Sequence, residues 1–185
     1  MVRVAPELTR PPKTLADLQA LPDETPAELI CGELYVTPSP SEPHQAVSLR
    51  LSSLLLAYEK SSGRGRAYAA PFDVHLPSGD VVQPDALFVR SANPGLAKDG
   101  VHGAPDLVVE IVSPSHPLHD RVVKRDLYGR NGVPEYWIVD PEERSVEVLK
   151  LEGRTYAPAG YGTGQVELRS PTLDDLVIRL ADLFP

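Results

Sequence analysis

Two acidic residues interrupt apolar segments of strand length. Asp85 stands near the start of a run that ends at Val89, and Glu110 lies within a second run between Pro105 and Val112. The two acids are 25 positions apart, which leaves room for one strand, a loop and a second strand. Two carboxylates at adjacent strand ends are a usual way to hold a hard divalent cation through oxygen ligands. The pair therefore indicates a metal site, with a simple turn aspartate as the alternative for Asp85.

Glu110 occupies a position that strand alternation predicts to be at least half buried, because successive residues point to opposite faces. One face carries Asp106, Val108, Glu110 and Val112, and the other carries Leu107, Val109 and Ile111. An unpaired buried carboxylate is costly, so Glu110 needs a metal ion, a cationic side chain or a shared proton. A structural arginine or lysine partner is the alternative to a metal.

Three polar residues after Glu110 form one stripe of a predicted helix. Asp120, Lys124 and Tyr128 follow one another at intervals of four, beside the apolar Val123 and Leu127. The stripe is compatible with a surface ion pair, which stabilises a helix by about 0.2–0.5 kcal/mol. It is equally compatible with a lysine that reaches over the strand end, where its ammonium would stabilise charge on a phosphate or position a water.

Other candidate groups precede the strands. His44 shares a helix face with Val47 and Leu51, so it is expected to face the core or a cleft, as a core histidine or as a positioning group. Glu28 and Glu33 lie in or beside an early hairpin, and their spacing does not reveal which way they point.

Two competing patterns have less support. The sequence His116-x-x-His119-Asp120 contains two metal-binding residue types, but no other ligand pattern accompanies it. Ser113 or Ser115 with a histidine would suggest a serine hydrolase, but the Gly-x-Ser-x-Gly elbow is absent.

Apolar periodicity and turn residues predict the elements that position these groups. Helices are predicted over 14–21, 42–60 and 115–130, with a closing helical turn over 180–184. Strands are predicted over 27–30, 33–37, 67–70, 72–76, 81–89, 106–113, 135–139, 145–151, 155–157 and 165–168, and a loop over 91–103. This order predicts an α+β or α/β fold with a mixed sheet flanked by helices. We expect an N-terminal arm with a short helix over 1–24 and a single domain over 25–185.

Composition limits the function classes. With 18 Lys and Arg against 26 Asp and Glu, the net charge of −8 argues against nonspecific coating of nucleic acid. The single cysteine excludes an internal disulfide, and neither a membrane span nor a leader peptide is apparent, so we expect a cytoplasmic protein. The sequence leaves open whether the chain forms a homodimer.

An ordered set of motifs covers roughly residues 25–150. The motifs are Glu28–Leu34, Thr37–Pro40, His44, Gln83–Asp85, Pro105–Ser115, Asp120, Lys124, Tyr128 and Gly132–Pro141. Together they resemble the Uma-two family of restriction-endonuclease-like proteins, within the PD-(D/E)XK nuclease superfamily. The resemblance implies a core of helix, mixed sheet and second helix that carries out metal-assisted phosphodiester hydrolysis of nucleic acid, with DNA as the expected substrate.

The resemblance also assigns roles to residues. Asp85 is similar to the motif aspartate and Glu110 to the acid of the (D/E)XK element, so both would bind Mg²⁺ or Mn²⁺ with the backbone carbonyl of Ile111. The pattern places a lysine where this chain has Val112, and Lys124 is the natural substitute.

The remaining candidates are expected to support the site or position the substrate: His44, Glu28, Asp120 and Tyr128. Two alternatives stay open, a catalytically silent binding module of the same fold and a different metal-dependent hydrolase.

Overall fold

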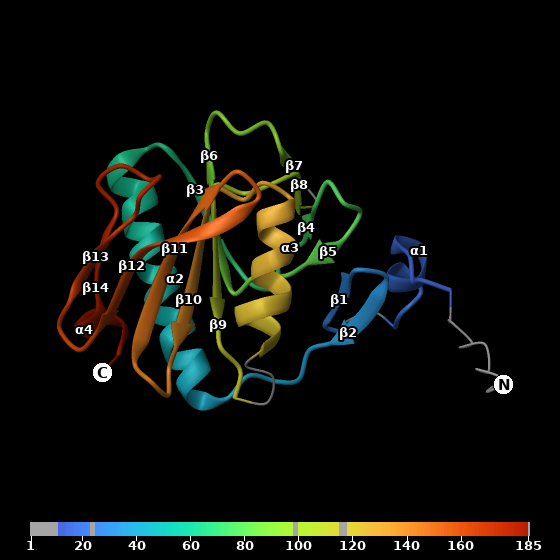
Figure 1. The fold of residues 1–185 in the computed structure, drawn as a ribbon, viewed down its shortest axis with the longest axis horizontal. Coiled ribbons are helices and arrows are strands. Elements are labelled where there is room, and N and C mark those ends of the chain that lie inside the picture. The colour runs from blue at the N-terminus through green and yellow to red at the C-terminus, as the bar shows by residue number, and fades with distance from the viewer. Residues whose placement is uncertain (1–10, 23–24, 98–99, 115–117, 185) are drawn as a thin grey trace, which may run out of the picture.

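The chain forms two six-stranded sheets, a two-stranded ribbon and several helices (Figure 1). The computed structural model describes residues 11–22, 25–97, 100–114 and 118–184. The mixed α+β fold predicted from the sequence is confirmed. The division into an arm and a domain stays a prediction. Within the described ranges, no helix is long and apolar enough to cross a membrane.

The central sheet contains the strands on either side of the two acids. Its spatial order is β12 (Thr155–Thr163), β11 (Ser145–Glu152), β10 (Glu135–Asp140), β9 (Leu107–Ile111), β6 (Ala86–Arg90) and β3 (Gly65–Ala69). Neighbours pair antiparallel except β9 and β10, which are parallel. Parallel neighbours need a crossover, and here it is a helical segment, η1 (His119–Lys124) followed by α3 (Arg125–Arg130).

The side sheet lies toward the N-terminus. Its order is β2 (Glu33–Val36), β1 (Ala27–Ile30), β5 (Val81–Val82), β4 (Val74–His75), β8 (Gly100–His102) and β7 (Leu96–Ala97). The short helix α1 (Leu15–Gln19) precedes it, with Thr14 as its N-cap. The remaining elements are β13 (Glu167–Arg169), β14 (Val177–Arg179) and α4 (Leu180–Leu183).

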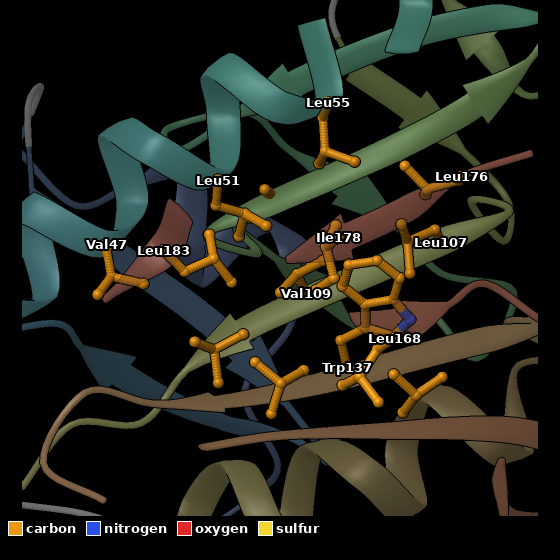
Figure 2. Close-up of a cluster of buried hydrophobic side chains, with 14 of the residues drawn as sticks. Val47, Leu51, Leu55, Leu107, Val109, Trp137, Leu168, Leu176, Ile178 and Leu183 are labelled. Atoms are coloured by element: carbon orange, nitrogen blue, oxygen red, sulfur yellow. The ribbon is translucent and has the colours of Figure 1, made fainter. Parts of the chain in front are cut away.

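Each face of the central sheet has its own hydrophobic core. The long helix α2 (Glu42–Ser62) packs Val47, Leu51 and Leu55 against one face, where Figure 2 shows Leu107, Val109 and Trp137. The other face packs against α3 and the side sheet through residues that include Val108 and Val112. The predicted alternation along β9 is therefore confirmed, and Glu110 belongs to the face that α3 covers.

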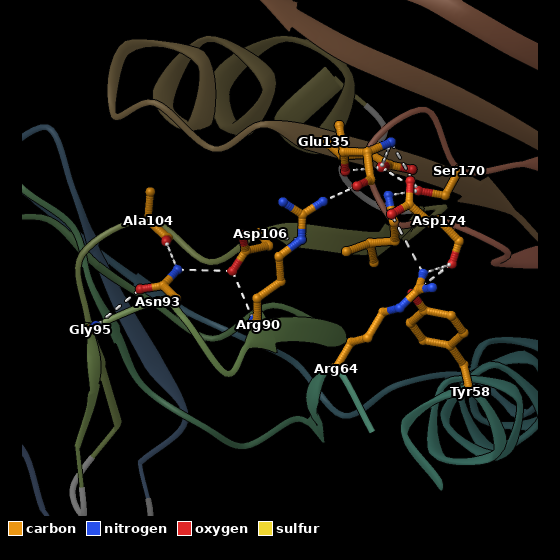
Figure 3. Close-up of polar contacts among 12 residues, drawn as sticks. Tyr58, Arg64, Arg90, Asn93, Gly95, Ala104, Asp106, Glu135, Ser170 and Asp174 are labelled. Atoms are coloured by element: carbon orange, nitrogen blue, oxygen red, sulfur yellow. Dashed lines mark hydrogen bonds and ion pairs between the residues drawn. The ribbon is translucent and has the colours of Figure 1, made fainter. Parts of the chain in front are cut away.

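The predicted boundaries of α2 are close to those observed. Pro43 lies in its first turn, where the missing N–H costs nothing, and Gly63 ends it with a left-handed φ of 63°. Tyr58, in the last turn, donates a hydrogen bond of 2.9 Å to the carbonyl of Asp174, and Arg64 donates one of 2.8 Å to the same oxygen (Figure 3). These bonds tie the C-terminal ribbon to the end of α2.

The predicted strand over 81–89 is wrong as a single element. It breaks into β5 and β6, which belong to different sheets. Pro84 has no N–H for a ladder, and the N–H of Gln83 donates to Glu28 Oε1 at 2.7 Å. The segment Gln83–Asp85 is therefore the junction between the two sheets, and it carries Asp85 where the chain changes sheet.

The predicted helix over 115–130 is also different in form. Residues 115–117 lie outside the described part, His119–Lys124 is a π-helix, and only Arg125–Arg130 is α-helical. Alignment of side chains at intervals of four does not distinguish these two helical forms. The predicted loop over 91–103 contains β7 and β8 because β8 pairs with β4 and β7 pairs with β8, which periodicity cannot anticipate.

Candidate active site

Lys124 and Glu110 meet in the interior, at the end of the central sheet. Lys124 Nζ lies 3.1 Å from Glu110 Oε1 and 3.0 Å from Glu28 Oε2. Tyr128 donates its hydroxyl hydrogen to Glu110 Oε1 at 2.6 Å. Glu110 is 2% exposed and Lys124 6% exposed. The predicted stripe is therefore a buried arrangement, and the surface ion pair that the spacing also allowed is excluded.

Asp85 reaches the same place because β6 pairs with β9. The register pairs Ala86 with Val109, so Asp85, the residue just before β6, lies opposite Glu110. Asp85 Oδ2 accepts the backbone N–H of Ile111 at 2.7 Å, and Asp85 Oδ1 lies 3.4 Å from His44 Nε2. The first turn of α2 therefore places His44 beside Asp85.

The π-helix brings the lysine to the site from outside the sheet. Val112, where the superfamily pattern has lysine, is buried in the core under α3. The backbone carbonyl of Asp120 accepts the Tyr136 hydroxyl at 3.0 Å, and the ring of His119 lies 4.7 Å from that of Tyr35. π-Helical turns are rare and frequently occur at functional sites. This one is held at its first two residues, His119 and Asp120, and it presents its last residue, Lys124, to Glu110.

Negative charge exceeds positive charge in this buried cluster. Burial alone lowers the pKa of Lys124, but the charges of Glu110, Glu28, Asp120 and Asp85 more than offset it, so that pKa is raised and the lysine stays charged. Burial raises the pKa of Glu110 well above its usual range, and Asp85, Asp120 and Glu28 raise it further against the opposing effect of Lys124.

The same cluster of charges shifts the pKa of two further side chains, Asp120 and His44. Burial raises the pKa of Asp120 to about 6, with a further contribution from Asp85 and an opposing one from Lys124. Burial lowers the pKa of His44, but its hydrogen bond to Asp85 and the charges of Asp85 and Asp120 outweigh this, so the net shift is upward. Both shifts have the direction expected of a cluster that lacks positive charge.

The carboxylates of Asp85 and Glu110 are the kind of ligand that a hard divalent cation would use. Carboxylate oxygens are the ligands that Mg²⁺ prefers, and it takes few of them from the protein because it retains several waters. Asp85 and Glu110 lie opposite each other, and a cation between them would offset the repulsion that raises the pKa of Glu110. Within the described residues, no three His, Cys, Asp or Glu side chains are grouped to hold a metal. Ile111 and solvent would therefore supply the remaining oxygens.

Some candidates lie elsewhere. Glu33 is exposed and accepts the Tyr35 hydroxyl at 2.9 Å, so only Glu28 of the two hairpin acids enters the site. His116 and Ser115 lie outside the described residues. The sequence did not indicate that Tyr35 contacts the helical segment that carries Lys124. The hairpin register pairs Tyr35 with Glu28, which places both on one face of the hairpin.

The family model Uma2, whose description is "Putative restriction endonuclease", matches residues 15–181. The chain belongs to the Uma2 family. The resemblance found in the sequence motifs is thereby confirmed, over a longer stretch than those motifs cover. A comparison with curated proteins found no match.

The fold of this Uma2 protein is similar to a solved crystal structure, that of "a putative nuclease belonging to DUF820" from Anabaena variabilis ATCC 29413. The TM-score is 0.77 at 22% sequence identity, over 94% of this chain and 98% of that one. This similarity shows that the two chains share a mixed α+β fold.

Tyr128→Phe tests how far the hydroxyl supports Glu110. Hydrogen bonds to charged groups contribute about 1.5–3 kcal/mol, so we expect the free energy of unfolding in urea to fall by about that amount. Tyr161→Phe is the control, because Tyr161 is 63% exposed and should change stability by less than about 0.5 kcal/mol. Equal effects of the two variants would contradict the assigned contact.

Proposed function

We propose that this Uma2 protein is a metal-dependent endonuclease that hydrolyses phosphodiester bonds of nucleic acid, with DNA as the first substrate to test. One observation carries the proposal. Asp85, Glu110 and Lys124 come from a sheet junction, a strand and a helix, yet they meet in one cluster, in which Glu110 and Lys124 are buried and Asp85 is half-buried.

Each group has a role that follows from its contacts. Asp85 and Glu110, with the carbonyl of Ile111, would hold Mg²⁺ or Mn²⁺. A bound divalent ion would polarise the phosphate and lower the pKa of a bound water. Lys124 remains charged and provides a fixed positive group for the negative charge that develops on the phosphate. His44 would orient Asp85 through Oδ1, while the Ile111 N–H donates to Oδ2.

The experiment compares wild type with Asp85→Ala/Glu110→Ala. We expect wild type to bind Mg²⁺ or Mn²⁺ in calorimetry and to cleave at least one of plasmid, linear duplex DNA, single-stranded DNA or RNA. Cleavage should stop with a chelator, and the double variant should lose both binding and cleavage. The control is Asp126→Ala/Glu143→Ala, which removes the same charge from exposed positions.

Two results would overturn the proposal. Metal binding and cleavage that persist unchanged in the double variant would exclude these carboxylates as the site. A wild-type protein that binds no divalent ion and cleaves none of the substrates would favour the silent binding module. The cytoplasmic location and the homodimer remain predictions.

A further inference from the structure

We propose that Glu28 is a positioning residue for Lys124, and that it holds the ammonium in place when Glu110 shares its charge with a cation. This inference rests on the proposed nuclease function. It concerns a residue of the β1–β2 hairpin, outside the strands that carry Asp85 and Glu110.

The two oxygens of Glu28 have separate partners. Oε1 accepts the backbone N–H of Gln83 at 2.7 Å, and Oε2 lies 3.0 Å from Lys124 Nζ. Glu28 is 5% exposed, so neither contact is exchanged freely with water. One carboxylate therefore connects the lysine to the backbone two residues before Asp85.

The hairpin that carries Glu28 is itself held from two sides. At its turn, the N–H of Cys31 donates to Asp80 Oδ1 at 2.6 Å, and Arg130 donates to Cys31 Sγ at 3.3 Å. Along β2, the Tyr35 ring lies against His119 of the π-helix. These contacts join the hairpin to the turn between β4 and β5 and to the helical segment that carries Lys124, so Glu28 is held in place relative to Lys124.

A lysine from a helix needs such a partner more than a lysine from the strand would. If the lysine stood at the position of Val112, the backbone of the strand would orient its side chain relative to Glu110. Lys124 enters from η1 on a flexible stem, which has about 2 kcal/mol of rotamer entropy to lose. Glu110 contacts it, but Glu110 is also a proposed metal ligand, whereas Lys124 is the one cationic side chain that contacts Glu28 among the described residues.

Glu28→Gln separates the two functions of this carboxylate. The variant keeps the size of the side chain and one acceptor oxygen. If that oxygen accepts the Gln83 N–H, the amide NH₂ faces Lys124 and cannot accept from it. Glu33→Gln is the matched control, because it makes the same charge change on the same hairpin at an exposed residue.

The first readout is the ¹⁵Nζ NMR signal of Lys124 in metal-free protein. The chain has five lysines, so Lys124→Arg assigns the signal by its disappearance. We expect Glu28→Gln to shift or broaden this signal and Glu33→Gln to leave it unchanged. The second readout is steady-state cleavage. A misplacement of about 1 Å can cost about 100-fold, so kcat should fall about 10- to 100-fold while KM for nucleic acid stays within about twofold.

The readouts separate failure of this inference from failure of the nuclease function. If wild type cleaves nucleic acid but the Lys124 signal is unchanged in Glu28→Gln, the role of Glu28 is overturned and the nuclease function is not. An unchanged kcat in Glu28→Gln would do the same. If wild type cleaves nothing although its Lys124 signal responds to Glu28→Gln, the contact is structural, and both the catalytic role of Glu28 and the nuclease function are overturned.

Discussion

Lys124→Met is expected to lower the free energy of unfolding of the metal-free protein by about 3–5 kcal/mol, because removing one partner of a buried ion pair leaves uncompensated charge. Lys124 is the one buried cation among the described residues, and it contacts both Glu110 and Glu28. Methionine keeps most of the volume, so the loss reports charge rather than a cavity. Urea denaturation with circular dichroism measures it.

The double variant Lys124→Met/Glu110→Gln distinguishes charge from packing. Removing a carboxylate together with its cation should restore part of the lost stability, with an interaction energy within about 0.5–3 kcal/mol. In cleavage assays, we expect Lys124→Met to reduce kcat by about 10²–10³, as the loss of one preorganised charge-stabilising group does. If the free energy of unfolding of Lys124→Met lies within about 1 kcal/mol of the wild-type value, Lys124 is not held as the structure describes.

Glu135→Ala is the second change with a large expected effect. Glu135 has no exposed surface, and its carboxylate accepts from Trp137 Nε1 at 2.5 Å, from Ser170 Oγ at 2.6 Å and from both the N–H and the hydroxyl of Thr172. Figure 3 shows Glu135 beside Ser170. A buried donor without an acceptor costs about 1–3 kcal/mol, but Ser170 and Thr172 are only half-buried and can donate to water instead, so we expect a loss of about 2–4 kcal/mol. Denaturant unfolding measures it, and Glu152→Ala, at an exposed residue, is the control.

The same residue gives the unfolding free energy a pH dependence with a defined sign. Burial raises the pKa of Glu135, although the bonds from Ser170, Thr172 and Trp137 lower it in part. A raised carboxyl pKa in the folded state contributes stability at low pH that is lost as the pH rises through that value. The free energy of unfolding of wild type, minus that of Glu135→Gln, should therefore fall from acidic to neutral pH. A difference that grows over this range would contradict the assignment.

Local patterns in the sequence predicted the elements that depend on local causes. Alternation along 106–113 correctly separated the two faces of β9 and indicated that Glu110 is buried, because the side chains of any strand alternate. The helix over 42–60 followed from its apolar spacing, its first-turn proline and its glycine stop. The motifs around Asp85 and Glu110 also identified the family.

The tertiary structure decided what depends on partners distant in sequence. Residues 81–89 were predicted as one strand, and only the hydrogen bond from Gln83 to Glu28 and the pairing of β6 with β9 show that the chain changes sheet at Asp85. No periodicity distinguished a π-helix from an α-helix in the segment that carries Lys124. Lys124 contacts Glu110 because the parallel pairing of β9 and β10 needs a crossover, and this crossover lies over Glu110. The sequence by itself determined which residues were available for the site, and long-range strand pairing determined which of them meet.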